Sequence, residues 1–125
     1  MKVINVVAAV IKKENLYLIA QRNHKKHLGL KWEFPGGKVE NNENFQDALI
    51  REIIEELSVK INIEKKITKK NYKDKKIDAI IHYFLCTLGE GIIKLTEHED
   101  FSWVEKKNLY KFNLVPGDKK ILPLI

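Results

Sequence analysis

The sequence reads Gly37-Lys-Val-Glu-Asn-Asn-Glu43 and, after seven further residues, Arg51-Glu-Ile-Ile-Glu-Glu56. An ideal helix turns about 100° per residue, so Glu52, Glu55 and Glu56 fall on one side of it. The apolar residues of the same segment form a separate, core-facing side. They are Phe45, Leu49, Ile50, Ile53, Ile54 and Leu57. The pattern therefore predicts an amphipathic helix with a core face and a carboxylate face.

The carboxylate face has two interpretations. Like charges three or four residues apart on an exposed helix cost a few tenths of a kcal/mol each, and a hard divalent cation with oxygen ligands would remove that cost. A solvated acidic face is the alternative, because exposed glutamates are common. The turn expected at Gly36-Gly37 favours the cation, since a residue without a side chain lets a backbone carbonyl approach a metal closely.

This stretch resembles the Nudix box, G-x5-E-x7-R-E-U-x-E-E-x-G-U, in which U is a bulky aliphatic residue. The matching positions are Gly37, Glu43, Arg51, Glu52, Ile53, Glu55, Glu56 and Val59. Ser58 departs from the pattern, because the family usually has glycine there. A left-handed residue other than glycine costs roughly 1–2 kcal/mol, unless the helix ends differently. The preceding Trp32-Glu-Phe-Pro-Gly-Gly-Lys38 narrows the resemblance to the MutT-like branch.

The resemblance implies an α/β fold, an α/β/α sandwich with a mixed, partly curled sheet. It also implies a Mg²⁺-dependent nucleoside triphosphate pyrophosphohydrolase that releases a nucleoside monophosphate and pyrophosphate, with oxidised dGTP as the favoured substrate. The alternatives are CTP or methylated dCTP, another nucleoside diphosphate linked to a moiety X, and a nucleotide-binding sensor without catalysis. Three questions stay open: the base preference, the oligomeric state (monomer or homodimer), and a role in DNA repair through cleaning of the nucleotide pool.

The same resemblance assigns roles to the acidic residues. Metal ligands are the Gly37 carbonyl, Glu55, Glu56 and Glu52, and Glu52 also activates water. The ion is Mg²⁺, with Mn²⁺ as a substitute, because all these ligands are hard oxygens. Glu97 is a further metal-side or catalytic carboxylate, or else an ordinary loop acid. Within the box, Glu43 and Arg51 are structural, and the arginine orients the glutamates.

Candidate substrate-binding residues lie at several places in the chain. Arg22 and Arg51 are the only arginines, and a planar guanidinium suits phosphate or carboxylate contacts that lysine cannot copy. Arg22 is therefore expected to reach the substrate phosphates, although an exposed strand-end charge is the alternative. Four further candidates could instead have an ordinary structural role, as packing, a solvent-facing charge or a helix cap. The remaining candidates are His27, Phe34, Lys38 and Asp118.

Composition indicates one domain over residues 1–125. The chain has a net charge of +6 and a single cysteine, Cys86, which is expected to be a buried small hydrophobe. No apolar run approaches the roughly 18 residues of a membrane span and no export signal is visible, so a cytoplasmic location is expected. Tyr72 is the only aromatic among the lysines of residues 60–76, too few for stacking on bases, which favours a solvated hairpin over a stable nucleic-acid complex.

Alternation and turn residues place the remaining elements. Asn44 is expected to cap the central helix, which ends near Leu57. A second strand follows a Glu14-Asn15 turn. His82 and Phe84 are expected to pack in the core, with a place in a base pocket as the alternative. The expected strands cover residues 3–12, 16–21, 32–34, 38–39, 59–67, 76–88 and 101–104, with a polar loop at 23–31, a helical turn at 106–110 and a last helix at 117–122.

Overall fold

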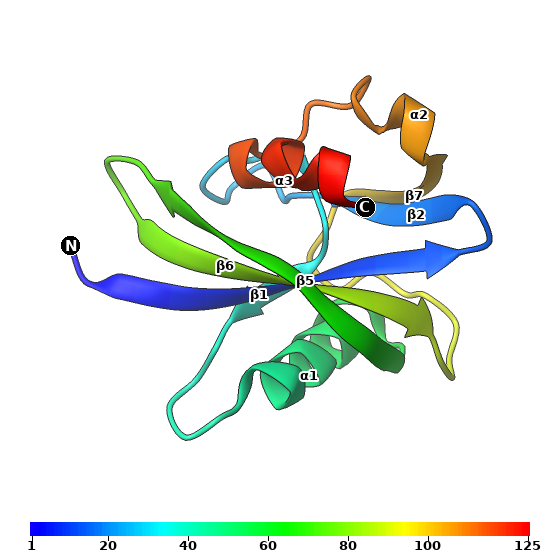
Figure 1. Ribbon diagram of the computed structural model, residues 1–125, viewed down its shortest axis with the longest axis horizontal. Coiled ribbons are helices and arrows are strands. Elements are labelled where there is room, and N and C mark those ends of the chain that lie inside the picture. The colour runs from blue at the N-terminus through cyan, green and yellow to red at the C-terminus, as the bar shows by residue number, and fades with distance from the viewer.

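A seven-stranded sheet lies between helices on both of its faces in the computed structural model, which describes residues 1–125 (Figure 1). In chain order the elements are β1 (Val3–Lys13), β2 (Leu16–Gln21), β3 (Trp32–Glu33), β4 (Gly36–Lys38), α1 (Phe45–Leu57), β5 (Ile61–Lys73), β6 (Asp78–Leu88), β7 (Asp100–Glu105), α2 (Lys106–Leu109), α3 (Pro116–Ile121) and the short 3-10 helix η1 (Leu122–Leu124). The predicted α/β/α sandwich is confirmed: α1 covers one face, and α2 with α3 covers the other.

The strand β1 organises the sheet. Its neighbours follow the order β3-β2-β1-β6-β5, while β4 pairs with β1 and β7 pairs with β2. The β1–β6 pairing is parallel and the others are antiparallel, so the sheet is mixed as predicted. Only the end of β1, at Lys12 and Lys13, pairs with β2. The sheet therefore splits around β1, and this split lets the chain between β2 and α1 reach the middle of the molecule.

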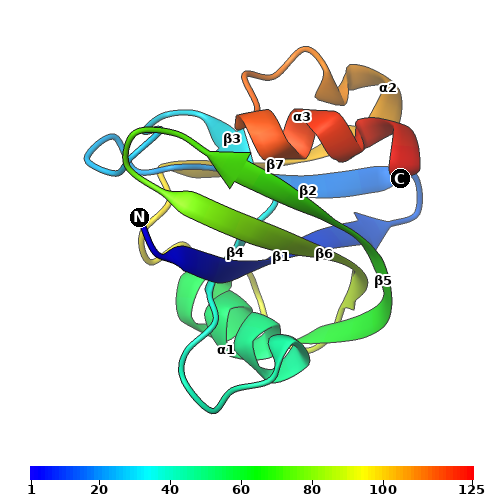
Figure 2. The ribbon, with the colours of Figure 1, turned by 60° about the vertical axis from the view of Figure 1, so that its left-hand side comes forward.

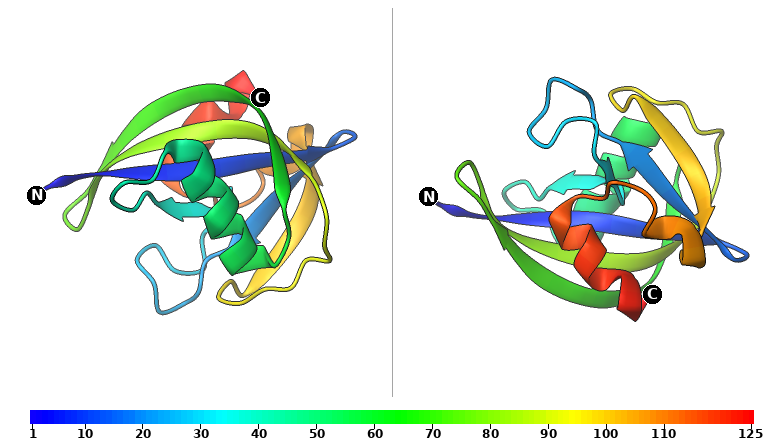
Figure 3. Two further views of the ribbon diagram at one scale, coloured as in Figure 1. Left: turned by 90° about the horizontal axis from the view of Figure 1, so that it is seen from below. Right: turned by 90° about the horizontal axis from the view of Figure 1, so that it is seen from above.

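Side chains of β1 alternate between two hydrophobic cores, as the two-residue period of a strand requires. Val7, Ala9 and Ile11 pack under α1 with Leu49, Ile53 and Leu57 of that helix. On the opposite face, Ala8 and Val10 join Leu109 of α2 and Ile121 of α3. Figure 3 shows α1 and α3 crossing the sheet on its two sides. A strand buried on both faces reads as a nearly continuous apolar run, which is why the sequence predicted it.

Both ends of α1 follow local chemistry. The Asn44 side chain accepts a hydrogen bond from the Asp47 N–H at 2.8 Å, which confirms the predicted cap. At the other end Ser58 adopts the left-handed conformation, with φ of 62°. Its N–H donates to the Ile54 carbonyl at 3.0 Å and its hydroxyl to the Lys94 carbonyl at 3.3 Å. The helix thus ends as a glycine would end it, and the serine bears a strain of roughly 1–2 kcal/mol.

Three expectations were wrong in detail. Gly36 and Gly37 do not form a turn; they lie in β4, opposite Ala8 and Val7 of β1. Ile54 is 43% exposed, so the core face of α1 is narrower than predicted. Glu56, which the helical wheel placed on a carboxylate face separate from the core face, is buried. The wheel fails there because segments far away in the sequence cover that side of the helix.

The lysine-rich segment forms a long hairpin. The strand β5 runs to Lys73, beyond the residue predicted, and β6 returns from Asp78. Asp74 closes the hairpin by accepting hydrogen bonds from the N–H groups of Lys76 and Ile77 at 2.8 and 2.9 Å. In Figure 2 this hairpin reaches the loop between β2 and β3.

Two further expectations concern side chains of β6. Cys86 is fully buried, and burial raises the pKa of its thiol to about 12, as expected for a residue that only packs. His82 and Phe84 are also buried, and His82 packs on Phe45, with ring centroids 4.1 Å apart. No helix of the structure combines the length and hydrophobicity needed to cross a bilayer.

Candidate active site

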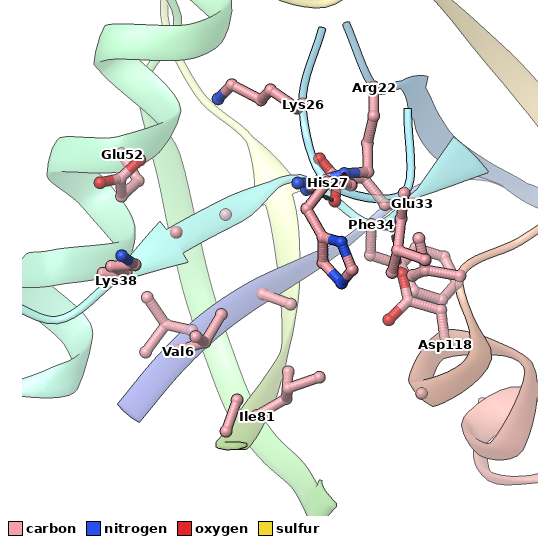
Figure 4. A pocket seen from close by; sticks show the side chains of 18 of the residues that line it. Val6, Arg22, Lys26, His27, Glu33, Phe34, Lys38, Glu52, Ile81 and Asp118 are labelled. Carbon is pink, nitrogen blue, oxygen red and sulfur yellow. Dashed lines mark hydrogen bonds and ion pairs between the residues drawn. The ribbon is translucent and has the colours of Figure 1, made fainter. Parts of the chain in front are cut away.

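One cavity of about 730 Å³ lies beside α1, β4 and the start of α3. All ten residues that the sequence predicted for metal binding, catalysis or substrate binding line it. They are Arg22, His27, Phe34, Gly37, Lys38, Glu52, Glu55, Glu56, Glu97 and Asp118. Figure 4 shows Glu52 and Lys38 at one end and Phe34 with Asp118 at the other, with Val6 and Ile81 between them. We call the first the carboxylate end (Gly37, Glu52, Glu55 and Glu56) and the second the Asp118 end.

Arg51 fixes the direction of the carboxylates on α1. Its Nε and Nη2 donate to the two oxygens of Glu43 at 2.7 and 2.9 Å, a bidentate pair. Its Nη1 donates to Glu52 at 2.9 Å and to Glu55 at 3.2 Å, and Nη2 also reaches the Lys38 carbonyl at 3.0 Å. The hydrogen bond from Arg51 is the main cause that lowers the pKa of Glu43 to about 2. One guanidinium therefore ties the helix to the strand before it.

Both glycines of β4 lie so close to neighbouring atoms that a side chain would not fit. A Cβ at Gly36 would lie 1.9 Å from the backbone oxygen of Val7, so any side chain would push β4 away from β1. A Cβ at Gly37 would lie 2.4 Å from the carboxylate of Glu52. The first glycine thus permits the strand pairing, and the second leaves room for a carboxylate against the backbone.

At the carboxylate end, one buried oxygen of Glu56, Oε2, lacks a hydrogen-bond partner. Burial raises the pKa of Glu56 to about 9, and the charges of Glu33 and Glu52 contribute to the rise. Ionising this buried group without a positive partner is costly, and a divalent cation is a partner that would relieve this cost. The residues present therefore fit a cation held by oxygen ligands.

The protein alone does not supply a complete ligand set for that cation. No three His, Cys, Asp or Glu side chains come together closely enough to hold a metal ion. Mg²⁺ in particular keeps several waters and binds through one or two carboxylates and substrate phosphates. A site of Glu56, Glu52 and the Gly37 carbonyl, completed by water and phosphate oxygens, agrees with that habit.

Glu97 stands on the loop before β7 and is paired with a lysine. Its Oε2 accepts a hydrogen bond from Lys26 Nζ at 2.6 Å, and this contact lowers the pKa of Glu97. Asn23 Nδ2 also donates to the Glu97 carbonyl at 3.1 Å. Glu97 faces the cavity, but it would have to exchange its lysine partner before it could bind a cation.

Asp118 is buried at the opposite end of the cavity. Its Oδ2 accepts from the Phe34 N–H at 2.7 Å and its Oδ1 from the Tyr83 hydroxyl at 2.6 Å. Burial raises the pKa of Asp118 to about 7, against the lowering effect of these two hydrogen bonds. The alternative that Asp118 caps α3 is wrong, because the capping residue is Val115 and no side chain caps that helix. Asp118 instead joins α3 to β6 and to the chain before β4.

Arg22 and His27 belong to a loop that is held on both sides. Arg22 donates from Nε to the His27 carbonyl at 2.9 Å and from Nη1 to Glu33 at 2.7 Å. The His27 ring lies 2.5 Å from Asp74, which also accepts from the Tyr72 hydroxyl at 2.7 Å. The guanidinium of Arg22 is thus already engaged within the protein, and its contact with a phosphate stays a prediction.

Comparison with known proteins gives the family. The NUDIX domain model matches residues 1–125. The chain is 35% identical over 122 residues to the 8-oxo-dGTP diphosphatase of Buchnera aphidicola subsp. Schizaphis graminum (strain Sg), covering 98% of this chain and 92% of that protein.

The chain belongs to the NUDIX family.

A second relative of this NUDIX chain is the CTP pyrophosphohydrolase of Escherichia coli (strain K12), 32% identical over 124 residues, which are 98% of this chain and 90% of that protein. Among solved structures, the solution NMR structure of MutT from Methicillin Resistant Staphylococcus aureus 252 superimposes with a TM-score of 0.79 at 41% identity. It covers 98% of this chain and 94% of that one. The predicted family is confirmed, and so is the prediction of a NUDIX hydrolase.

Four polar residues in or beside the NUDIX site were not predicted from the sequence, among them Lys26, which lines the cavity. Glu33 lies inside the quoted Trp32–Lys38 segment but was given no role, although it bonds to Arg22 and to His98 Nε2, the latter at 2.9 Å. His98 follows Glu97 directly and was given no role either. Tyr83, which holds Asp118, was hidden in the apolar run of β6. Each of these residues is a polar side chain in a loop or in a mostly apolar strand, which is only a weak sign of function in the sequence. Their roles become visible through contacts with residues distant in the chain.

Proposed function

We propose that this NUDIX hydrolase is a Mg²⁺-dependent pyrophosphohydrolase of nucleoside and deoxynucleoside triphosphates, with oxidised dGTP as its favoured substrate. The observation that carries the proposal is that the carboxylate end and the Asp118 end belong to one cavity. A nucleotide can then place its phosphates beside Glu52 while its base lies against Asp118. The relatives named 8-oxo-dGTP diphosphatase and CTP pyrophosphohydrolase support a triphosphate substrate.

Each group at the carboxylate end has a proposed task. Glu52, Glu55, Glu56 and the Gly37 carbonyl would hold Mg²⁺, or Mn²⁺ in its place. The bound ion would neutralise the triphosphate and make water more acidic. Glu52 takes the proton of the water that attacks an inner phosphorus, and the products are a nucleoside monophosphate and pyrophosphate. Arg51 keeps Glu52 in the direction in which it can accept this proton.

Residues on the loops complete the phosphate side. Lys26 and Lys38 both line the cavity and offer ammonium groups to the triphosphate. When Lys26 turns to a phosphate, Glu97 is released to the cation or to the attacking water. Arg22 holds the loop through Glu33 and His27, and it offers the triphosphate a further positive charge.

The base is proposed to bind at the Asp118 end, between Phe34, His27 and the apolar side chains of β1 and β6. A carboxyl group with a pKa near 7 exists in both protonation states at neutral pH. The protonated form can donate to a carbonyl of an oxidised guanine, whereas the ionised form can only accept. The second candidate substrate is CTP, whose amino group can donate to the ionised form. The Escherichia coli relative named CTP pyrophosphohydrolase supports this candidate.

The test is release of pyrophosphate from a panel of oxidised dGTP, dGTP, CTP, methylated dCTP and ADP-ribose. We expect the highest kcat/KM with oxidised dGTP, with nucleoside monophosphate as the second product, and loss of activity in a chelator. A highest value with CTP would establish the second candidate. Nucleotide binding without turnover of any compound in Mg²⁺ would leave only a sensor function and overturn the proposal.

The proposed setting is the cytoplasm, where the enzyme would remove oxidised triphosphates before a polymerase uses them and so protect DNA. We propose a single domain over residues 1–125 that acts as a monomer or homodimer on a small-molecule substrate. Light scattering on the purified protein, with and without nucleotide, measures the oligomeric state directly.

A further inference from the structure

His98 lies at the inner edge of the carboxylate end, on the loop that also carries Glu97. Its side chain is only 5% exposed. The ring Nε2 is 2.9 Å from Glu33 Oε2 and 3.9 Å from Glu56 Oε2, the oxygen that has no hydrogen-bond partner. The other ring nitrogen, Nδ1, is buried without a partner. The imidazole therefore stands between the buried Glu56 and the partly buried Glu33, although it has no part in the proposed hydrolysis.

The contacts of Glu33 fix which nitrogen carries the hydrogen. Glu33 accepts a hydrogen bond from Arg22 through Oε1 at 2.7 Å, so it acts as a carboxylate with acceptor oxygens. At Oε2 the histidine must then donate, which places the hydrogen on Nε2. This N–H donates to Glu33, and Nε2 lies 3.9 Å from Glu56 Oε2. Glu33 is thus held from both sides, by the guanidinium of Arg22 and by the imidazole of His98.

Freeing Glu33 would change the cation site. Two carboxylates in one buried region repel each other when both are ionised, and a carboxylate with only one partner can rotate. A rotated Glu33 would either compete for the cation or press on Glu56. Partners that orient metal ligands in this indirect way typically change metal affinity 10- to 100-fold when they are removed.

We propose that His98 is a positioning residue for the divalent-cation site: its Nε2–H holds Glu33 against Arg22 and so keeps Glu56 free and correctly oriented for the cation. The inference rests on the proposed function, because it takes Glu56 as a ligand of the cation. It concerns affinity for the cation and not the chemical step itself.

A purely structural role as an anchor of the loop is a weaker explanation. The loop has several other attachments. The Glu99 N–H donates to the Gln21 carbonyl at 2.9 Å, and Glu99 Oε2 accepts from the His24 N–H at 3.0 Å and contacts the His24 ring. Thr96 donates to the Glu55 carbonyl at 2.8 Å. The loop therefore stays attached without His98, and Glu99 offers a matched control in the same segment.

The experiment measures Mn²⁺ binding to the nucleotide-free protein by electron paramagnetic resonance. Four variants are compared with the wild type: His98→Gln, His98→Asn, His98→Leu and Glu99→Gln. Glutamine can place an N–H near the position of Nε2, asparagine is too short to do so, and leucine has no donor. Circular dichroism melts record whether each variant is folded, and the asparagine and glutamine pair decides the question if the leucine variant does not fold.

We expect the Mn²⁺ dissociation constant to rise at least tenfold in His98→Asn and His98→Leu. It should stay within about threefold of wild type in His98→Gln and in the Glu99→Gln control, where the donor is kept. Equal affinity in folded His98→Asn and wild type would overturn the inference. So would equal weakening in the glutamine and asparagine variants, or a wild type that binds no Mn²⁺. A wild type that binds Mn²⁺ but hydrolyses no triphosphate would overturn the proposed function alone, since the comparison of affinities would still hold.

Discussion

The two ends of the cavity are built in different ways. At the carboxylate end, the glycine, the arginine and the glutamates all come from residues 37–56, and Arg51 bonds to Glu43, Glu52, Glu55 and the Lys38 carbonyl. At the Asp118 end, the partners are far apart in sequence: Asp118 bonds to Phe34, 84 residues away, and to Tyr83, 35 residues away. The residues proposed for the chemistry are thus encoded locally, whereas the surface proposed for the base depends on the whole fold.

This difference has a consequence for substitutions. A change at Glu52 or Glu55 acts on a half-buried or exposed group that α1 supports independently, so turnover should suffer more than stability. A change at the Asp118 end acts on a buried junction of three elements, so stability, specificity and pH dependence should change together. Four substitutions and one titration test that contrast, in order from the largest expected effect to the smallest.

Glu52→Gln should abolish most turnover and leave the fold intact. The amide cannot accept the proton of the attacking water, and removal of a general base typically costs about 10²–10⁴-fold in rate. Nucleotide binding should persist, because the other carboxylates remain. Single-turnover kinetics and a titration with a non-hydrolysable triphosphate measure both quantities. Near wild-type turnover would assign the proton transfer to another residue.

Gly37→Ala and Gly36→Ala form a matched pair within β4. At Gly37 the new methyl group meets the Glu52 carboxylate, a movable side chain, so kcat should fall by roughly 10²-fold through misplacement of that group with a small change in melting temperature. At Gly36 it meets the Val7 backbone, and overpacking of this kind typically costs about 1–3 kcal/mol.

Turnover and thermal melts on both variants separate the two glycines. The contrast fails if Gly37→Ala loses stability without losing activity, or if Gly36→Ala retains the stability of the wild type.

Asp118→Asn should change which base is preferred. Asparagine donates and accepts at fixed positions, whereas the aspartate can only accept once ionised. A mismatched buried polar group costs roughly 1–3 kcal/mol, so the ratio of kcat/KM between oxidised dGTP and CTP should shift by about tenfold or more. The asparagine can still bond to Phe34 and Tyr83, which keeps the variant folded. An unchanged ratio would mean that other residues select the base.

Asp118 should also make stability fall with rising pH. Its pKa is raised in the folded state, from the ordinary 3.8 to about 7. Between these values the unfolded chain releases its proton while the folded protein keeps it, so the free energy of unfolding declines as the pH rises and then levels off above about pH 7.

The difference in melting temperature between wild type and Asp118→Asn isolates this contribution from that of Glu56, because both proteins contain that residue. In the presence of chelator, the wild type should lose several degrees relative to the variant between pH 4.5 and pH 7.5. If the difference in melting temperature between wild type and Asp118→Asn does not change between pH 4.5 and pH 7.5, Asp118 is already ionised in the folded protein at low pH.

The contrast between the two ends also explains what the sequence predicted well. The capped helix, the buried strand Leu16–Gln21 and the glutamates of α1 follow from short-range patterns, and the structure agrees with them. The burial of Glu56, the strand at Gly36-Gly37 and the junction of Asp118 with Tyr83 do not follow, because each depends on a segment distant in the chain. The helical wheel treats Glu56 like Glu55, yet Glu55 is 57% exposed while Glu56 is buried. Residues that lie over the helix make that difference, and no pattern within residues 45–57 contains it.

The distribution of arginine gives the molecule a built-in pair of spectroscopic reporters. The chain has two arginines among its 23 basic residues. Arg51 is bonded to Glu52 and Glu55 of α1, and Arg22 to Glu33 beside the loop between β2 and β3. Protein in which only arginine is isotopically labelled would therefore give guanidinium NMR signals from two residues, one in each network, with no background from the lysines. Titration of such a sample with cation and then with nucleotide would follow the two networks separately and in real time.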